Sequence, residues 1–126
     1  MKTNEAESLF EKLGGMDAVN AAVDIFYKKV LADDEINYFF TGINMQEQNV
    51  KLKTFLATAF GAALPYPGKS LKEAHTQLVR MGLTDKHFDA VKYHLISTLM
   101  ELNVPEELIT EVAKIAESTR KDVLGR

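Results

Sequence analysis

The sequence predicts a single all-α domain that spans residues 1–126. Apolar residues recur three and four positions apart along nearly the whole chain, and this spacing places them on one face of a helix. Serine, threonine or asparagine precedes several of these stretches as a helix cap, and glycine follows several of them. No stretch alternates apolar and polar residues as a half-buried strand does. A chain of this length can bury one hydrophobic core, so we expect one domain.

The first half of the chain predicts four helical segments. The Gly14-Gly15 pair ends the first segment, because glycine adopts the left-handed conformation that terminates a helix. Asn44 and Glu47 have the spacing of a capping box and open the fourth segment. The four segments, in order, cover residues 9–13, 16–30, 36–40 and 45–60.

The second half predicts three helices behind an irregular loop. Residues 61–69 contain two prolines and two glycines, which indicate a loop. Ser70 and Glu73 form an S-x-x-E capping box that opens the first of these helices, and Thr84 caps the second. Pro105 stands where a first-turn proline belongs and opens the third. The expected helices cover residues 71–81, 85–102 and 105–116.

Composition excludes several classes of protein. The formal net charge is −3 and no basic stripe is present, so we expect no nucleic-acid partner. The chain has no cysteine, which excludes disulfides, thiolate catalysis and cysteine-ligated metal centres. Residues 1–8 are polar and acidic, unlike a signal peptide, and no apolar stretch reaches the roughly 20 residues of a membrane span. We therefore expect a soluble, cytoplasmic protein.

The chain has three histidines, and His75 differs from the other two. It lies one turn from Leu71 and Leu78, on the apolar face of its helix, where an imidazole needs a partner. It is either a neutral core histidine bonded to a backbone carbonyl or an axial ligand of a heme iron, and position alone favours the first. We interpret His87 as a surface residue and His94 as partly exposed and structural. No two histidines are four positions apart, so a structural zinc site is not expected.

Three further polar side chains are unusual for a plain helical core. Tyr27 continues an apolar stripe but carries a hydroxyl, which needs a partner when it is buried. Gln48 and Lys51 are three positions apart and lie on neighbouring faces of one helix. The simpler interpretations are a Tyr27 hydroxyl that reaches the surface and a solvated face for Gln48 and Lys51. The spacing of residues alone does not specify a cofactor.

A series of short motifs extends from Leu9 almost to the C-terminus. They are the Leu9–Gly15 stretch LFEKLGG, Phe26-Tyr27, Phe39-Phe40, Phe55 with Ala59-Phe60-Gly61, Pro67-Gly68, Glu73-Ala74-His75, the Leu83–Ala90 stretch and Val104-Pro105. Each motif alone is weak, but their order and spacing together resemble the group I truncated hemoglobins, which are two-over-two helical globins. The resemblance implies a two-over-two helical sandwich around heme b.

The resemblance also implies roles for individual residues. His75 matches the proximal histidine that binds the iron, and Tyr27 matches the distal tyrosine whose hydroxyl stabilises bound O2. Gln48 matches a distal polar position, from which it donates to the same ligand or orients the tyrosine. One net hydrogen bond of about 1–1.5 kcal/mol changes affinity roughly tenfold. The residues expected to pack against the heme are Phe40, Phe55 and Leu71.

The chain departs from the family at two distal positions. Many relatives have a second distal glutamine where this chain has Leu52, so the expected donors are reduced to Tyr27 and Gln48. Some cyanobacterial relatives have a histidine where this chain has Lys51, and there it coordinates the iron. Lysine coordinates iron only as the neutral amine, whereas a charged Lys51 pairs with a heme propionate instead. Both alternatives stay open, and the charge of lysine at pH 7 favours the propionate.

The functional expectation is a heme protein that binds O2 and other diatomic ligands such as NO and CO. Oxidation of NO to nitrate is one possible reaction, and it needs a separate reductase. An alternative is a six-coordinate, Lys51-ligated heme protein for electron transfer or nitrogen-oxide chemistry. A more remote alternative is a heme-free helical interaction module, which the joint presence of Tyr27, Phe40 and His75 disfavours. Some relatives link heme covalently through a C-terminal histidine, but no histidine follows His94, so we expect non-covalent heme.

Overall fold

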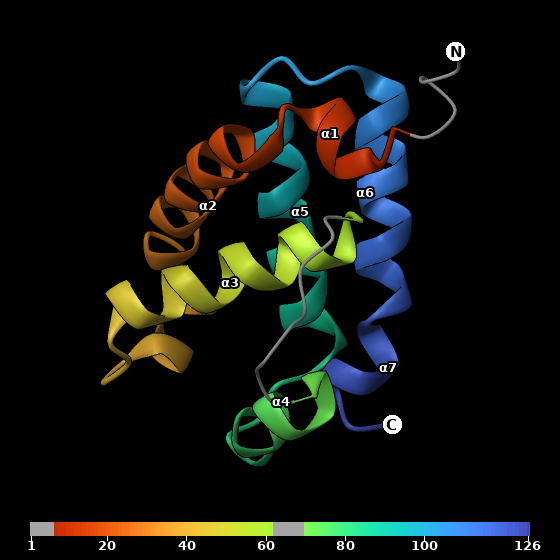
Figure 1. Ribbon diagram of the computed structural model, residues 1–126. Helices are drawn as coiled ribbons and strands as arrows, with labels where there is room; N and C mark the ends of the chain where they lie inside the picture. Colours follow the sequence, from red (N-terminus) through yellow and green to blue (C-terminus); the bar gives the residue numbers. More distant parts are fainter. Residues whose placement is uncertain (1–6, 62–69) are drawn as a thin grey trace.

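The computed structural model describes residues 7–61 and 70–126, and within them every regular element is a helix (Figure 1). The predicted all-α class is confirmed. The elements are α1 (Leu9–Leu13), α2 (Gly15–Leu31), the 3-10 helix η2 (Asn37–Phe40), α3 (Met45–Ala59), α4 (Leu71–Arg80), α5 (Asp85–Glu101), α6 (Glu106–Ser118) and α7 (Arg120–Val123). No helix in the described part of the chain has the length and apolar character needed to cross a membrane.

Side-chain caps begin α3 and α4 where the sequence predicted them, whereas the hydroxyl of Thr84 makes no capping hydrogen bond at the start of α5. The Ser70–Glu73 capping box is complete, with Glu73 N donating to Ser70 Oγ and Ser70 N donating to Glu73 Oε1, each at 3.2 Å. Asn44 caps α3 by accepting a hydrogen bond from Glu47 N at 3.2 Å. Pro105 occupies the N-cap of α6, one position before the first turn in which it was expected.

Glycine ends two helices at points of close backbone approach. Gly14 has φ 117° between α1 and α2, and Gly61 has φ +104° after α3. A Cβ on Gly61 would lie 2.9 Å from Ser8 Cβ, so the end of α3 approaches the start of α1 closely. The amide of Phe10 also donates to the carbonyl of Phe60 at 2.8 Å. Apart from Gly61, the predicted loop over residues 61–69 lies outside the described residues.

The last predicted helix is followed by a further short helix that was not predicted. The predicted helix, α6, ends at Ser118, and a separate turn, α7, begins at Arg120. The hydroxyls of Ser118 and Thr119 donate to the carbonyls of Ile115 and Ala116, at 2.5 Å and 2.6 Å. Such local bonds offer the backbone an alternative to the helical ladder, which accounts for the break.

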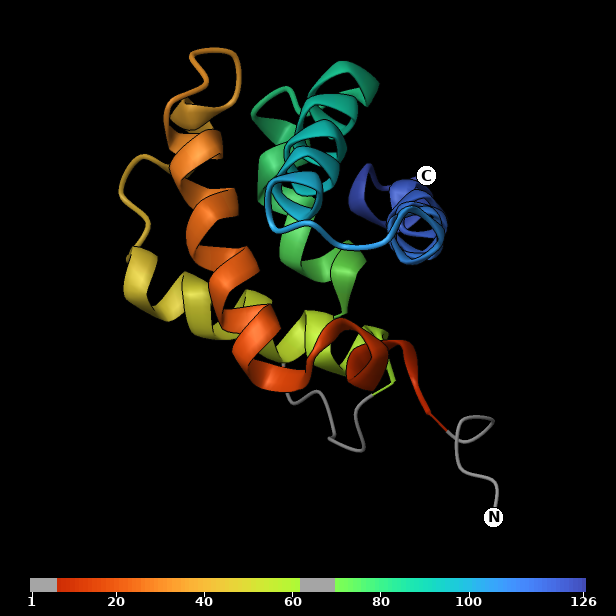
Figure 2. The same cartoon turned by 90° about the horizontal axis from the view of Figure 1, so that it is seen from above.

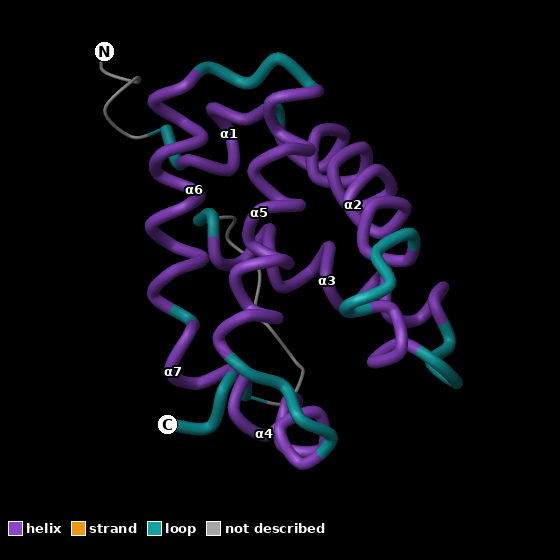
Figure 3. Tube along the Cα trace, turned by 180° about the vertical axis from the view of Figure 1, so that it is seen from behind, coloured by secondary structure: helices purple, strands orange, loops and turns teal. Residues whose placement is uncertain are grey.

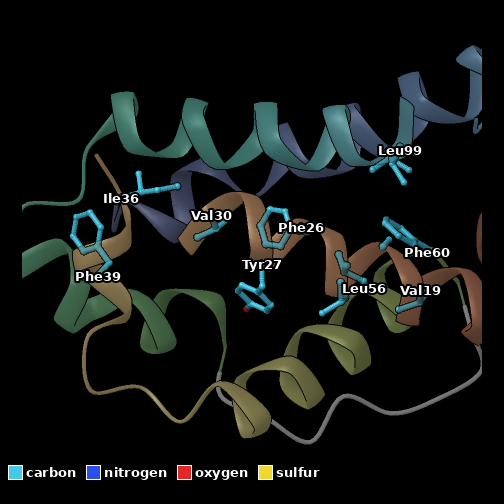
Figure 4. Packing of buried hydrophobic residues seen from close by; sticks show 12 residues of the cluster. Val19, Phe26, Tyr27, Val30, Ile36, Phe39, Leu56, Phe60 and Leu99 are labelled. Atoms are coloured by element: carbon cyan, nitrogen blue, oxygen red, sulfur yellow. The ribbon is translucent and has the colours of Figure 1, made fainter. Parts of the chain in front are cut away.

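The long helices pack as two pairs. α2 packs against α3, α5 packs against α6, and contacts between α2 and α5 join the pairs (Figure 2). Figure 4 shows apolar side chains of α2 directed toward α5 and α3. The buried cluster is formed by Val19, Ala22, Val23, Phe26, Tyr27, Val30, Ile36, Phe39, Leu56, Phe60, Leu99 and Val112. The fold is therefore the predicted two-over-two arrangement.

α4 lies apart from this core, at the end of the molecule opposite α1, beside α7 (Figure 3). Its ten residues include none that is buried, although Leu71, His75 and Leu78 give it an apolar face. Leu78 and Leu83 reach the edge of the core and hold one end of the segment against it. This leaves the helix that carries His75 as the least enclosed of the longer helices described.

Candidate functional site

Tyr27 and Gln48 join α2 to α3 through a hydrogen bond. Tyr27 is only 6% exposed, and its hydroxyl oxygen points toward α3 (Figure 4). The Nε2 of Gln48 donates to that oxygen at 3.1 Å. The interpretation in which the Tyr27 hydroxyl reaches the surface is therefore wrong, and so is a fully solvated Gln48. Lys51, one turn further along α3, is exposed, as a solvated face predicts.

Burial determines the protonation of Tyr27. It raises the pKa of the phenol from 10.0 to about 12, and the hydrogen bond from Gln48 partly opposes this by lowering it. The hydroxyl is thus neutral at pH 7 and keeps its proton. Since the amide of Gln48 is the donor in their bond, the hydrogen of the Tyr27 hydroxyl is not used in it. That hydrogen can be donated to a ligand on the same side of the site.

His75 is held in one tautomer by its own helix. Its Nδ1 lies 2.8 Å from the carbonyl oxygen of Leu71, one turn earlier in α4. A carbonyl can only accept, so Nδ1 carries the hydrogen and donates it. In the neutral imidazole Nε2 then carries a lone pair. Histidines that bind metals commonly donate their other ring N–H to a backbone carbonyl in this way. The same bond would also be made by a histidine that is buried in the core and binds no metal. The ring of His75, however, is only half-buried.

Apolar side chains accompany these polar groups. Phe40 of η2 lies edge-on to the Tyr27 ring, with centroids 5.8 Å apart and an interplanar angle of 74°. Leu52 and Phe55 follow Gln48 on α3 at positions i+4 and i+7, on the same side of the helix. Phe40, Leu52 and Phe55 all pack against the core and are only partly buried. They therefore keep apolar surface that a further group could cover.

These residues fit a heme on the chemistry of the donor set. The imidazole of His75, with its Nδ1 bonded to a carbonyl, leaves Nε2 available for a metal, and the protonated phenol of Tyr27 on another helix offers a hydrogen-bond donor. The partly exposed apolar side chains of η2 and α3, together with the apolar face of α4, suit a flat hydrophobic ligand. The contacts bring Tyr27, Gln48 and Phe40 together. His75 and Leu71 stand on a different helix, α4.

The other two histidines have structural partners. Nδ1 of His87 accepts from the amide of Thr84 at 3.0 Å, and the ring lies edge-on to Phe39, so it is half-buried rather than a surface residue. Nε2 of His94 lies 2.7 Å from Oδ2 of Asp33, which confirms its structural role. The sequence analysis missed Asp33, because the two residues are 61 positions apart and no local signal connects them.

Comparison with known proteins identifies the family of the chain. The two-over-two arrangement of α2, α3, α5 and α6 is that of a globin. The chain belongs to the bacterial-like globin family, whose model matches residues 8–124, and the family binds heme. Its resemblance to the group I truncated hemoglobins is thereby confirmed.

Relatives match over nearly their whole length. The chain is 48% identical to the group 1 truncated hemoglobin GlbN of Synechocystis sp., over 94% of this chain and 98% of that protein. It is 46% identical to the group 1 truncated hemoglobin of Tetrahymena thermophila, over 94% and 96% of the two chains. The 2/2 hemoglobin of Synechococcus sp., solved in the cyanomet state with covalently attached heme, superposes with a TM-score of 0.92. That match has 49% identity and covers 95% of this chain and 100% of the other.

Proposed function

We propose that this protein binds O2, NO or CO at the iron of a heme b that His75 ligates. The observation that carries the proposal is the Gln48–Tyr27 hydrogen bond of 3.1 Å, which fixes a buried phenol and leaves its proton for a ligand. When bound, heme supplies the iron at which the diatomic ligand coordinates. No histidine follows His94, so we propose that the heme is held non-covalently, unlike that of the Synechococcus protein.

Each residue of the proposed site has a separate role. Nε2 of His75 offers its lone pair, and the Leu71 carbonyl keeps the ring in that tautomer and orientation. Tyr27 donates its hydroxyl hydrogen toward the ligand, while Gln48 orients the phenol. Leu52 excludes water and adds no donor. Phe40, Phe55 and Leu71 cover the faces of the ring system with apolar surface. The strength of ligand binding therefore depends mainly on one hydroxyl group.

We propose that Lys51 pairs with a heme propionate. Its side chain is exposed on α3. Lysine coordinates iron only as the neutral amine, whereas an ion pair with a carboxylate uses the ammonium form. The competing proposal is Lys51 as a sixth ligand, which suits electron transfer or nitrogen-oxide chemistry. Oxidation of NO to nitrate at the same site needs an electron donor in addition, and we assign that role to a separate reductase in the cytoplasm.

Absorption spectra of the heme-loaded protein test these proposals. We expect a Soret band, and for the ferrous state the same five-coordinate spectrum in the unmodified protein and in Lys51→Ala. The variant His75→Gly should lose this spectrum and regain it when imidazole is added. Lys53→Ala is the matched control, since Lys53 is on the same helix and faces Asp24.

Two outcomes contradict the proposals separately. Split, low-spin visible bands in the ferrous unmodified protein that collapse in Lys51→Ala show that Lys51 is the sixth ligand. The absence of a Soret band after heme addition to the unmodified protein shows that the chain does not use heme.

A further inference from the structure

α4, the helix that carries His75, is held in place by its contacts with another helix and not by burial of its own residues. α4 has ten residues, none of them buried, and a helix of this length is marginal in water by itself. Among the described elements its most extensive packing is against α7, as Figures 1 and 3 both show. A Cβ on Gly125, just after α7, would lie 3.8 Å from Cγ2 of Val79 on α4. The placement of α4 therefore depends on the placement of α7.

α7 is itself too short to be stable alone, and Arg120 at its first position fixes it. The guanidinium donates from Nη1 to Asp85 at 2.9 Å and from Nη2 to Asp89, both on α5. It also donates from Nε to Glu117 Oε2 at 2.7 Å and from Nη2 to Oε1 at 3.0 Å. Its central carbon lies 4.5 Å from the centroid of the Phe88 ring. One side chain thus joins α5, α6 and α7.

The geometry of this cluster suits arginine specifically. The two bonds to Glu117 are bidentate, which needs the planar fork of a guanidinium, and the stacking on Phe88 needs its flat face. The Arg120 side chain is 20% exposed, so it is shielded more than most surface ions. The hydrogen bond from Arg120, followed by that from Lys92, lowers the pKa of Glu117 to about 2. Glu117 therefore stays charged at neutral pH.

We propose that Arg120 is a positioning residue for His75: it fixes α7 against α5, and α7 in turn fixes α4. It acts without touching the heme. The inference rests on the proposed function insofar as His75 is the iron ligand, but the mechanical link between Arg120 and α4 can be measured by itself.

The test compares Arg120→Met, Arg120→Lys and the unmodified protein, with Lys121→Met as the control for an exposed cation on the same turn. Amide hydrogen exchange is followed in α4 and in α2 of the protein as purified. We expect exchange in α4 to become about tenfold faster in Arg120→Met, with α2 unchanged. Arg120→Lys keeps the positive charge but loses the planar fork of the guanidinium. Its exchange rate in α4 should therefore lie between those of the unmodified protein and Arg120→Met. Lys121→Met should match the unmodified protein.

A second measurement connects the helix to the ligand. In the heme-loaded ferrous protein, resonance Raman spectroscopy reports the iron–histidine stretching frequency, which depends on how the imidazole is held. We expect this band to shift or broaden in Arg120→Met, to be partly restored in Arg120→Lys, and to stay in place in Lys121→Met. A residue that only stabilised the whole fold would not move the band.

The proposal is overturned if α4 exchange in Arg120→Met is unchanged, or if α2 accelerates by the same factor, because the effect is then absent or global. If Arg120→Met does not fold, Arg120→Lys decides by the same criterion, with faster exchange confined to α4 as the supporting result. If the unmodified protein takes up no heme, the proposed function fails, while α4 exchange still decides whether Arg120 positions that helix.

Discussion

Tyr27 is the residue on which ligand affinity should depend most. Its hydroxyl is buried, neutral and oriented by Gln48, and Leu52 provides no second donor. We expect Tyr27→Phe to increase the O2 dissociation rate about tenfold, which corresponds to a lost hydrogen bond of about 1–1.5 kcal/mol. The CO dissociation rate should change much less, because bound CO carries little negative charge.

Stopped-flow ligand replacement measures both rates. Gln48→Leu is the informative companion, since it keeps the phenol but removes its orienting partner, and it should have a smaller effect than Tyr27→Phe. Equal O2 dissociation rates in Tyr27→Phe and the unmodified protein would show that the phenol does not contact the ligand.

The protonation of Tyr27 gives a separate prediction at alkaline pH. Its pKa is raised from 10.0 to about 12 by burial, so the folded protein disfavours the phenolate. The stability linked to this group is complete below pH 10 and is lost as the pH rises toward 12. The difference in tyrosinate absorbance between the unmodified protein and Tyr27→Phe should be centred near pH 12.

Two variants check the assignment of that titration. Tyr93→Phe removes an exposed tyrosine (66% exposed) and should leave the Tyr27 component unchanged. Gln48→Leu removes the hydrogen bond that lowers the pKa of Tyr27, so the Tyr27 component of the titration should shift to higher pH. A Tyr27 component centred near pH 10 would show that the phenol is hydrated.

The chemical roles of single residues were predictable from the sequence only where a motif marked them. The motifs and the resemblance identified Tyr27, Gln48 and His75. They could not show that the carbonyl of Leu71 fixes the imidazole, because that bond depends on the backbone of α4. Arg120 gave no signal, since its carboxylate partners on α5 are 31 and 35 positions away. Contacts between residues distant in sequence require the fold.

At the scale of elements, the boundaries of the helices follow from local rules. Capping boxes and left-handed glycines end or begin most helices within a residue or two of where the sequence placed them. The short helix α7 was not predicted, because no sequence pattern marks a further turn after residue 116. The hydroxyls of Ser118 and Thr119 donate to backbone carbonyls at the end of α6 and compete there with the helical bonds. Whether these hydroxyl bonds or the helical backbone bonds form depends on how α6 and α7 pack in the fold.

Gly61 tests how the end of α3 is joined to α1. Its φ of +104° is unfavourable for any other residue, and a Cβ there would lie 2.9 Å from Ser8 Cβ. Gly42 has φ +80° with no atom within 4 Å of the same position, so it is a matched control. We expect Gly42→Ala to lower the free energy of unfolding by about 1 kcal/mol, and Gly61→Ala by about 2–3 kcal/mol.

Urea denaturation of both variants measures this difference. The excess cost of Gly61→Ala reports the clash with Ser8, because backbone strain is common to both positions. Equal losses in the two variants would show that Ser8 moves aside freely and that the contact between α1 and the end of α3 is loose.

At the scale of the whole molecule, the two helix pairs are joined by the apolar core and α4 is attached at the edge. Ion pairs such as Lys29–Glu101 and Lys53–Asp24 connect different helices, but partly exposed pairs of this kind contribute little stability each. The Arg120 cluster differs because several carboxylates share one shielded cation. The molecule therefore has a stable apolar core, and the end that contains α4 and α7 is attached to it through charged side chains.

Acid should detach α7 from α5 before it destabilises the core of the molecule. The hydrogen bond from Arg120 lowers the pKa of Glu117 from 4.5 to about 2 and also lowers that of Asp85. Because these folded-state pKa values lie below the unfolded ones, their contribution is complete above about pH 4.5 and is lost as the pH falls toward 2. Amides of α7 should thus lose exchange protection in this window before those of α2. In Arg120→Met, α7 protection should already be low at neutral pH and change little on acidification. Simultaneous loss of protection in α7 and α2 of the unmodified protein would contradict this order, since it would mean that the charges stabilise the fold as a whole.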